Sequence, residues 1–375
     1  MENVSNDLKK AVIRNIIYLI IVLGLTALAF YLTIGNNIYK IDDVLKTANI
    51  WYIIAILGVV LGCILCRSIA IFALTRITYK DYFFHRAIAI DQIGTLYRMV
   101  TPAGLGSHIM EAHTYVTQGV RRSSALSILA MYSIVYQVVL ILYGVVAIIV
   151  KRDLINAIQY VSIYDAKIPL WLLVGIGFGF NILTIGFILL LSYWEGFFKF
   201  LRGPICKLLF KMHILKDLER ARTHLDGSKI NFRTNLKTLF RNAKTLIICI
   251  IMFFIYITIS YSVPYIAGLS LGNTSIYANY WDSVLFSNIH QMVTAVIPIP
   301  GGSGLSEYFF YQLFYPSQGP QFYSTDEIAR ASLLLWRSLM FIIPLFIACI
   351  FTVIYHPRKR LKSHAVNQED QNLEE

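Results

Sequence analysis

Charged residues are scarce in this sequence, and their scarcity excludes most classes of soluble protein. Only 14% of the 375 residues are Asp, Glu, Lys or Arg, whereas 57% are hydrophobic and the mean hydropathy is +0.61. A chain of this composition must place most of its length against lipid or against other helices. The sequence therefore predicts an integral membrane protein and excludes a soluble globular one.

Acidic residues are the scarcer charge, with 21 Asp and Glu against 33 Lys and Arg, which gives a formal net charge of +12. A basic chain of this kind can indicate nucleic-acid binding. Here, however, the basic residues lie between apolar runs, where the cytoplasmic surface of a membrane explains them better. The expected partner is a membrane phospholipid, and no nucleic acid is expected.

Cysteine and the common catalytic motifs are also sparse or missing. Cys63 and Cys66 form a C-x-x-C inside an apolar run, where thiolates would be inaccessible, so we interpret them as packing residues. The sequence has no G-x-S-x-G, no H-E-x-x-H and no phosphate-loop lysine. It therefore predicts no metal, no other cofactor and no catalytic residue.

Long apolar runs are what the sequence has in abundance. Six of them can cross a hydrocarbon core of about 30 Å at about 1.5 Å per helical residue. They cover residues 11–34, 49–74, 124–150, 168–193, 246–269 and 332–355. No small-residue cleavage site follows the first run, so we interpret it as a retained span. The predicted fold class is an all-α polytopic membrane protein.

Two further apolar stretches are too short to cross and end at proline and glycine. The first covers residues 84–100 and breaks at 101–106, and the second covers 284–299 and breaks at 300–304. Both breaks contain P-x-G-x-G. An unsatisfied N–H in lipid costs several kcal/mol, so broken membrane helices usually line a polar cavity or are buried in protein. The alternative is a structural kink, but two matching breaks favour a functional site.

The placement of Lys and Arg predicts the topology. Basic residues cluster before the first span, after the second, before the third, within 193–244 and after the last, which places both termini in the cytoplasm of a plasma-membrane protein. These cytoplasmic positions are mutually consistent only if the two broken segments are re-entrant hairpins. The first would enter from the cytoplasm and the second from outside. Opposed hairpins of this kind indicate an inverted repeat.

The same pattern divides the chain into regions. Residues 1–356 form the predicted membrane domain, and residues 357–375 form a polar cytoplasmic tail. Within the membrane domain, residues 194–244 form a basic cytoplasmic loop with apolar residues at near-helical spacing. Either a helix lying in the membrane interface or an ordinary positive loop explains that spacing.

Ionisable and amide side chains within the apolar runs mark a candidate site, because a charge at the bilayer centre costs at least about 2.5 kcal/mol. Glu307 follows the second break by one helical turn, and we expect it to pair with Arg337 of the last span. Either Arg67 or Arg98 is the analogous partner of Glu111. Snorkelling to the interface is the alternative for Arg98, Glu111 and Asp282. The others at this depth are Asp91, Gln92, His108, His290 and Gln291.

The half-helix after the second break would present free N–H groups and the positive end of its dipole, which suits a phosphate or carboxylate. Its sequence, Pro298 to Glu307, resembles the P-x-P-G-G-x-G-x-x-E signature of the lysylphosphatidylglycerol synthase transmembrane family, also described as flippase-like. The earlier break resembles the T-P-x-x-x-G element of that family. The resemblance covers residues 10 to 355. Members often have Glu or Gln directly after the first glycine cluster, whereas this chain has Ser107 and His108 there.

The resemblance implies a function in membrane lipids. The full multiple peptide resistance factor adds a cytosolic domain that transfers lysine from lysyl-tRNA to phosphatidylglycerol. This chain stops at Glu375, so we expect only the membrane half. The implied activity is translocation of an anionic or aminoacylated phospholipid, linked to cell-envelope charge and resistance to cationic antimicrobial peptides.

Two alternatives remain open at this point. One is that the chain belongs to a phosphatidylglycerol lysyltransferase system with a separately encoded acyltransferase, and the other is that it is an accessory subunit of a membrane glycosyltransferase. If the protein translocates a lipid, the residues expected to bind the lipid headgroup are Pro300, Gly301, Gly302, Ser303, Gly304, Glu307 and Arg337. The expected counterparts in the first hairpin are Pro102, Gly104, Gly106, His108, Glu111, Arg67 and Arg98.

Overall fold

The structure of the protein is a computed structural model. It describes residues 38–101, 104, 106–163, 166–193, 203, 232–294 and 299–355, together with positions 20, 24, 27, 28 and 31. The predicted first span at 11–34, most of the basic loop at 194–244 and the tail at 357–375 lie outside the described residues.

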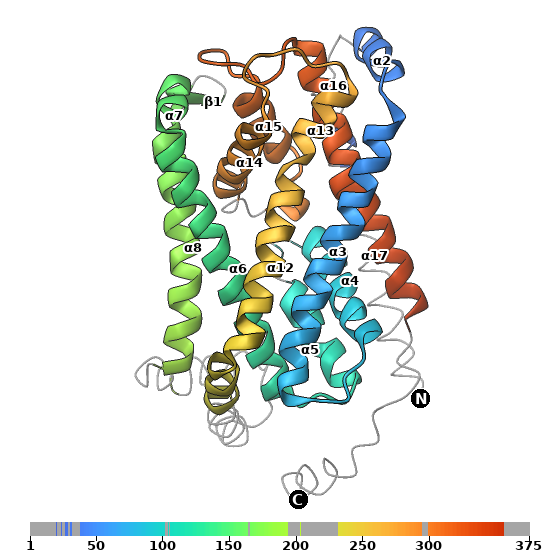
Figure 1. The fold of residues 1–375 in the computed structure, drawn as a ribbon, viewed down its shortest axis with the longest axis vertical. Coiled ribbons are helices and arrows are strands. Elements are labelled where there is room, and N and C mark those ends of the chain that lie inside the picture. The colour runs from blue at the N-terminus through green and yellow to red at the C-terminus, as the bar shows by residue number, and fades with distance from the viewer. Residues whose placement is uncertain are drawn as a thin grey trace, which may run out of the picture.

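Five helices in the described part of the chain are long and apolar enough to cross a membrane. They run roughly along the long axis of the molecule (Figure 1). These helices are α3 (Ile50–Thr78), α6 (Arg122–Val150), α8 (Leu170–Tyr193), α12 with α13 (Ala243–Tyr261 and Val263–Ser270), and α16 with η5 and α17 (Asp326–Arg337, Ser338–Ile342 and Ile343–Ile354). The prediction of a helical polytopic membrane protein is confirmed.

Proline bends the fourth of these spans, and a neighbouring helix supplies the hydrogen bonds that the bend removes. Pro264 lies at the start of α13. The Tyr261 carbonyl accepts hydrogen bonds from the hydroxyls of Ser283 and Ser287 at 3.1 and 3.2 Å, and the Tyr265 amide donates to Ser283 at 3.1 Å. These serines belong to α14 (Tyr280–Thr294), so the bend and α14 hold each other in place.

Two pairs of short helices fill the two halves of the bundle. The first pair is α4 (Phe84–Val100) with α5 (Gly106–Thr117), and the second is α14 with the 3-10 turn η4 (Pro300–Gly302) and α15 (Leu305–Phe314). In Figure 1 the first pair lies in the lower half and the second in the upper half, each starting and ending at its own end of the molecule. We name them the lower hairpin and the upper hairpin.

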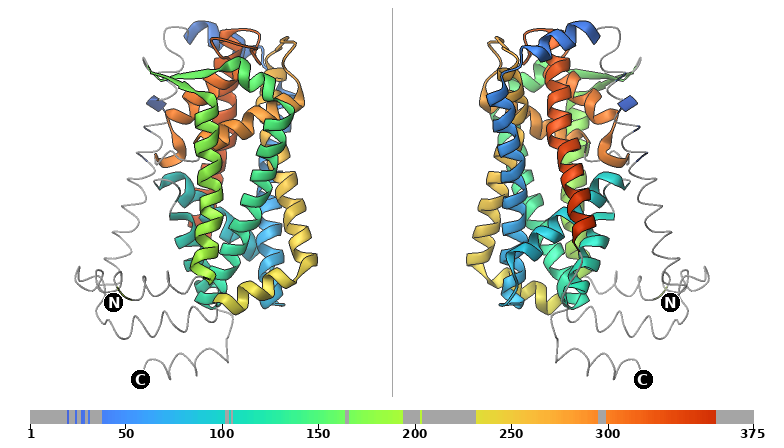
Figure 2. Two further views of the ribbon diagram at one scale, coloured as in Figure 1. Left: turned by 90° about the vertical axis from the view of Figure 1, so that its left-hand side faces the viewer. Right: turned by 90° about the vertical axis from the view of Figure 1, so that its right-hand side faces the viewer.

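The tips of the two hairpins meet near the middle of the molecule. A Cβ atom added to Gly301 in the upper hairpin would lie 3.2 Å from the carbonyl oxygen of Met99 in the lower hairpin. Figure 2 shows the two pairs in opposite halves from both sides. The two proline- and glycine-containing breaks, at 101–106 and 300–304, thus lie close together in the fold although they are far apart in the sequence.

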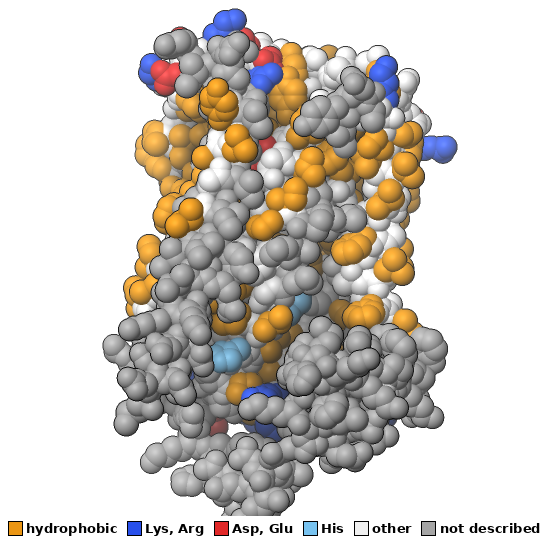
Figure 3. Space-filling view, turned by 180° about the vertical axis from the view of Figure 1, so that it is seen from behind, with side chains coloured by type: hydrophobic (Ala, Val, Ile, Leu, Met, Phe, Trp, Pro, Cys, Tyr) orange, Lys and Arg blue, Asp and Glu red, His pale blue; other side chains and the backbone are white. Residues whose placement is uncertain are grey.

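Each hairpin has its own hydrophobic surroundings. Around the lower one, buried residues of α3, α6 and α12 form one cluster that includes Leu74, Tyr132 and Phe253. Around the upper one, residues of α8 and α16 join a cluster that includes Phe310 and Phe314. Apolar side chains also cover much of the outer face, between ends that carry most of the charges (Figure 3). That surface suits a lipid environment.

The remaining elements lie at the upper end. Helix α2 (Ile38–Lys46) packs on α16 through Ile41, and α7 (Arg152–Ile158) follows α6. A small antiparallel hairpin of β1 (Tyr160–Ile163) and β2 (Ala166–Pro169) pairs Val161 with Ile168. The sequence interpretation had no strands here and began the span at 168, whereas α8 begins at Leu170.

Candidate functional site

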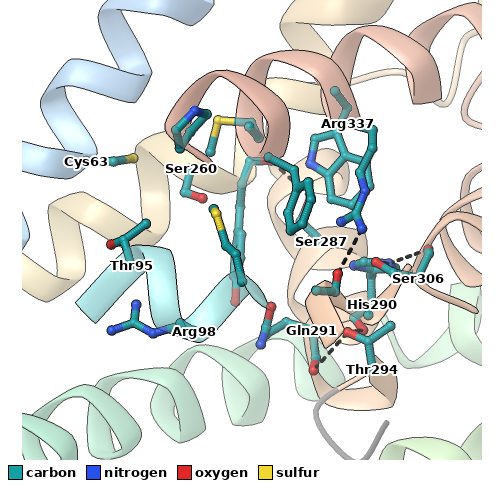
Figure 4. Close-up of a pocket in the computed structure, with 18 of the residues that line it drawn as sticks. Cys63, Thr95, Arg98, Ser260, Ser287, His290, Gln291, Thr294, Ser306 and Arg337 are labelled. Atoms are coloured by element: carbon teal, nitrogen blue, oxygen red, sulfur yellow. Dashed lines mark hydrogen bonds between the residues drawn. The ribbon is translucent and has the colours of Figure 1, made fainter. Parts of the chain in front are cut away.

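A cavity of about 380 Å³ lies where the two hairpin tips meet. Its wall is formed by α3, α4, α12, α14, η4, α15, α16, η5 and α17, so almost every element of the bundle centre contributes (Figure 4). The volume is within the usual range of ligand pockets. The position and size make it the candidate binding site of the protein.

The predicted ion pair of Arg337 and Glu307 is confirmed on the upper side of this cavity. Arg337 Nε lies 2.6 Å from Glu307 Oε1, as a close charge contact and not an aligned hydrogen bond. Arg337 Nη2 donates to the Gly301 carbonyl at 2.8 Å and to Ser303 Oγ at 2.9 Å. The guanidinium also stacks 3.8 Å above the Phe341 ring. Both charges are almost completely buried, so each stabilises the other.

Glu307 also caps the N-terminus of its own helix, α15. Its Oε2 accepts a hydrogen bond of 2.7 Å from the Gly304 amide, and Glu307 stands at the third helical position of α15. The carboxylate therefore occupies the positive end of the helix dipole. The sequence had suggested that this end binds an anionic ligand, but the anion found beside it belongs to the protein. The ligand-facing charge on this side is that of Arg337.

Glycine is required at the upper tip by backbone geometry. Gly301, Gly302 and Gly304 all have positive φ angles, of 61°, 64° and 93°. Side chains other than glycine rarely adopt this conformation. The three glycines turn the chain tightly between Pro300 and α15, which places the Gly301 carbonyl against Arg337.

A second ion pair lies across the cavity, between α3 and α4. Arg67 donates from Nε to Asp91 Oδ1 at 2.7 Å and from Nη2 to Asp91 Oδ2 at 3.1 Å. The guanidinium also lies 5.3 Å from the centre of the Tyr256 ring. The Gln92 amide donates to Asp91 Oδ2 at 2.9 Å. The sequence predicted that either Arg67 or Arg98 pairs with Glu111. The structure pairs Arg67 with Asp91 instead.

The other option, Arg98 with Glu111, is the pair that forms in the lower hairpin. Arg98 Nη2 lies 3.3 Å from Glu111 Oε1, and Ser107 Oγ donates to the same oxygen at 2.8 Å. His108 Nδ1 lies 2.9 Å from Glu111 Oε2. Glu111 is buried, whereas 41% of the Arg98 side chain is exposed. Gly94 makes room for this pair, because a Cβ there would lie 2.0 Å from Glu111 Oε1.

The remaining predicted residues are placed as follows. Gly104 lines the cavity, Gly106 begins α5 and donates its amide to Thr101 Oγ1 at 3.0 Å, and Pro102 lies outside the described residues. Asp282 does not reach the cavity wall, because it forms an ion pair with Lys151 near the upper end of α6. Its role is to tie α14 to α6.

Sequence reasoning missed the aromatic part of the wall and gave His290 no partner. His290 Nε2 donates to the Ser306 carbonyl at 2.8 Å, and its ring packs edge-on against Trp336 at 5.4 Å. Tyr256 and Tyr261 of α12 also line the cavity. In a chain with 24 Tyr and 23 Phe, no sequence signal separates these side chains from aromatic residues that face lipid.

A comparison with known protein families identifies the family of this chain. Residues 15–348 match the family described as the lysylphosphatidylglycerol synthase TM region. The chain belongs to this family. The match includes both hairpins and nearly all of the last span, so the cavity lies wholly within the family's transmembrane region. Among curated proteins, no significant match is found. Membership establishes a multi-pass membrane protein in a family of lipid modification.

Proposed function

We propose that the protein moves the polar head of a membrane lipid between the two leaflets, with the cavity as the headgroup site. The observation that carries this proposal is the set of three arginine–carboxylate pairs around one cavity at mid-bundle: Arg67–Asp91, Arg98–Glu111 and Arg337–Glu307. Ionisable residues at this depth are costly and typically mark the path of a polar substrate. A lipid head is such a substrate.

Opposed re-entrant hairpins are part of the proposal. Each hairpin starts and ends at its own end of the bundle and stops near the middle, so each gives the cavity a wall facing a different leaflet (Figure 1). Broken helices that meet at a central site are typical of transporters with inverted repeats. A relative movement of the two tips, which touch at Met99 and Gly301, would expose the cavity to one leaflet at a time.

The charge at the two ends supports an orientation with the lower end in the cytoplasm. The lower end is rich in described basic residues and has Asp81 as its acid, whereas acids and bases are balanced at the upper end. At the lower end the described basic residues are Arg76, Lys80, Arg86, Arg121, Arg122, Arg233, Lys237, Arg241 and Lys244. At the upper end the acids are Asp42, Asp43, Asp153, Asp282, Asp326 and Glu327. The positive-inside rule then places the lower hairpin on the cytoplasmic side.

The test is a translocation assay with purified protein in liposomes that contain a head-labelled phospholipid. A membrane-impermeant quencher added outside reports how much label has crossed. Wild-type protein should translocate the lipid, and Arg337→Gln should be slower by about tenfold or more, since removing one charged contact costs at least about 1.4 kcal/mol. Arg330→Gln is the matched control, because Arg330 lies on the same helix α16 in an ion pair with Asp326 outside the cavity wall.

Two results would contradict the proposal. Liposomes with wild-type protein that translocate no more label than empty liposomes would exclude lipid movement under these conditions. Equal rates for Arg337→Gln and wild type would exclude the cavity as the site. Aminoacylated lipid made by this chain alone, from lysyl-tRNA and phosphatidylglycerol, would instead favour the enzyme hypothesis.

A further inference from the structure

Each of the three arginines around the cavity keeps one terminal nitrogen free of described protein partners. Arg67 donates hydrogen bonds from Nε and Nη2, and Arg98 and Arg337 donate them from Nη2, while Arg337 Nε makes only the charge contact with Glu307. Within the described part of the chain, nothing accepts a hydrogen bond from Nη1 of any of them. An unpaired guanidinium nitrogen away from water is costly, so the donors of the buried Arg67 and Arg337 suit an anion in the cavity, and the half-exposed Arg98 adds positive charge beside them.

The carboxylates that balance the arginines lie behind them. Asp91, Glu111 and Glu307 are each at most 2% exposed, and none of them is part of the described cavity wall. The tip segments outside the described residues, 102–103, 105 and 295–298, contain no acidic residue in the sequence. A cationic group in the cavity would therefore meet guanidinium groups without a carboxylate to bind it.

The rest of the polar wall is neutral. Ser260 and Tyr261 of α12, together with Ser287, Gln291 and Thr294 of α14, line the cavity (Figure 4). Hydroxyl and amide groups both donate and accept hydrogen bonds, which suits the hydroxyls of a polyol or sugar and gives an ammonium group no balancing charge.

We infer that the headgroup bound here is a phosphate ester whose remaining polar part is neutral, and not an aminoacylated, cationic headgroup. The phosphate oxygens accept from Nη1 of the arginines, and the neutral part contacts the wall of α12 and α14. This inference rests on the proposed function and narrows its substrate. It also assigns Glu307 a positioning role toward Arg337, in place of direct contact with a substrate amine.

The test compares ligands on full-length wild-type protein in phosphatidylcholine nanodiscs. Native mass spectrometry counts the phosphatidic acid, phosphatidylglycerol or lysylphosphatidylglycerol that the protein retains. Both anionic lipids should be retained at least about tenfold more than the lysyl lipid, because its ammonium would lie beside guanidinium groups without a balancing carboxylate. Inorganic phosphate and glycerol phosphate form separate arms and should compete weakly. Tight binding of free phosphate without retention of lipid would overturn the lipid assignment.

Two variants sharpen the test. Arg337→Gln should reduce retention of phosphatidylglycerol by about tenfold, and the control Arg330→Gln should leave it unchanged. Gln291→Glu places a carboxylate in the neutral wall and should raise retention of the lysyl lipid relative to phosphatidylglycerol. It keeps the test usable if Arg337→Gln fails to fold.

Failure of this inference can be distinguished from failure of the proposed function. Wild-type protein that retains the lysyl lipid at least as strongly as phosphatidylglycerol, and translocates it, would overturn the inference and leave lipid movement standing. Wild-type protein that translocates none of these lipids would overturn the proposed function itself.

Discussion

Gly177 in α8 lies so close to α14 that a Cβ atom there would be 2.1 Å from the carbonyl oxygen of Met292. Backbone meets backbone at this point, so the contact cannot yield by rotating a side chain. Small residues allow membrane helices to approach in this way. The contact places α14, and with it one wall of the cavity, against α8.

We therefore predict that Gly177→Ala destabilises the protein by about 1–3 kcal/mol, the usual cost of overpacking. Unfolding by sodium dodecyl sulfate in mixed micelles gives the measurement. Gly175→Ala and Gly179→Ala are matched controls on the same helix, because neither added Cβ would have an atom within 4 Å. Their effect should stay below about 1 kcal/mol. Equal effects at all three glycines would show that the contact with Met292 does not limit stability.

The buried pair of Glu307 and Arg337 gives a second prediction. Glu307→Gln or Arg337→Gln leaves the other charge buried without its partner, so each should cost about 3–5 kcal/mol in the same unfolding measurement. The double variant Glu307→Gln with Arg337→Gln removes both charges, so its loss should be well below the sum of the two single losses. A double variant as unstable as the sum of the singles would mean that the two charges do not interact.

The sequence predicted those parts of the site that depend on patterns within a short stretch of residues. Hydropathy and length are local, so the five described spans and the end of the first short helix at Val100 were predicted. The second short helix ends at Thr294, before the predicted 299, and the last span begins at Asp326, before the predicted 332. The pair Glu307–Arg337 was also predicted, because the acid stands one turn after a glycine break and the arginine lies in an otherwise apolar span. Each of these signals can be read within a few helical turns.

The ion-pair partners that lie on different helices could not be predicted in the same way. The sequence interpretation offered Arg67 to Glu111 alone, whereas packing of α3 on α4 pairs it with Asp91, which is 24 positions away. The small β-hairpin of β1 and β2 was missed, and the predicted span began at 168, which lies inside β2. The cavity itself depends on where the two hairpin tips meet, and no local pattern encodes that contact.

The proposed topology predicts opposite accessibility for two exposed residues. Lys80 lies in the connection between α3 and α4 at the lower end, and Ile276, 87% exposed, lies in the connection before α14 at the upper end. In intact cells, a membrane-impermeant maleimide should label Ile276→Cys and leave Lys80→Cys unlabelled until the membrane is permeabilised, in a background without the natural cysteines. Labelling of both positions in intact cells would contradict the opposed hairpins.

The contact between Gly301 at the upper hairpin tip and Phe341 of η5 gives the last prediction. A Cβ at Gly301 would lie 2.5 Å from the Phe341 ring, on which Arg337 stacks. Gly301→Ala should therefore displace Phe341 and Arg337 and slow lipid translocation by about tenfold or more. Gly272→Ala is the matched control: its φ of 71° carries the same backbone cost of about 1–2 kcal/mol, but its Cβ would meet no atom within 4 Å. If both variants translocate equally well, the position of Arg337 does not limit translocation.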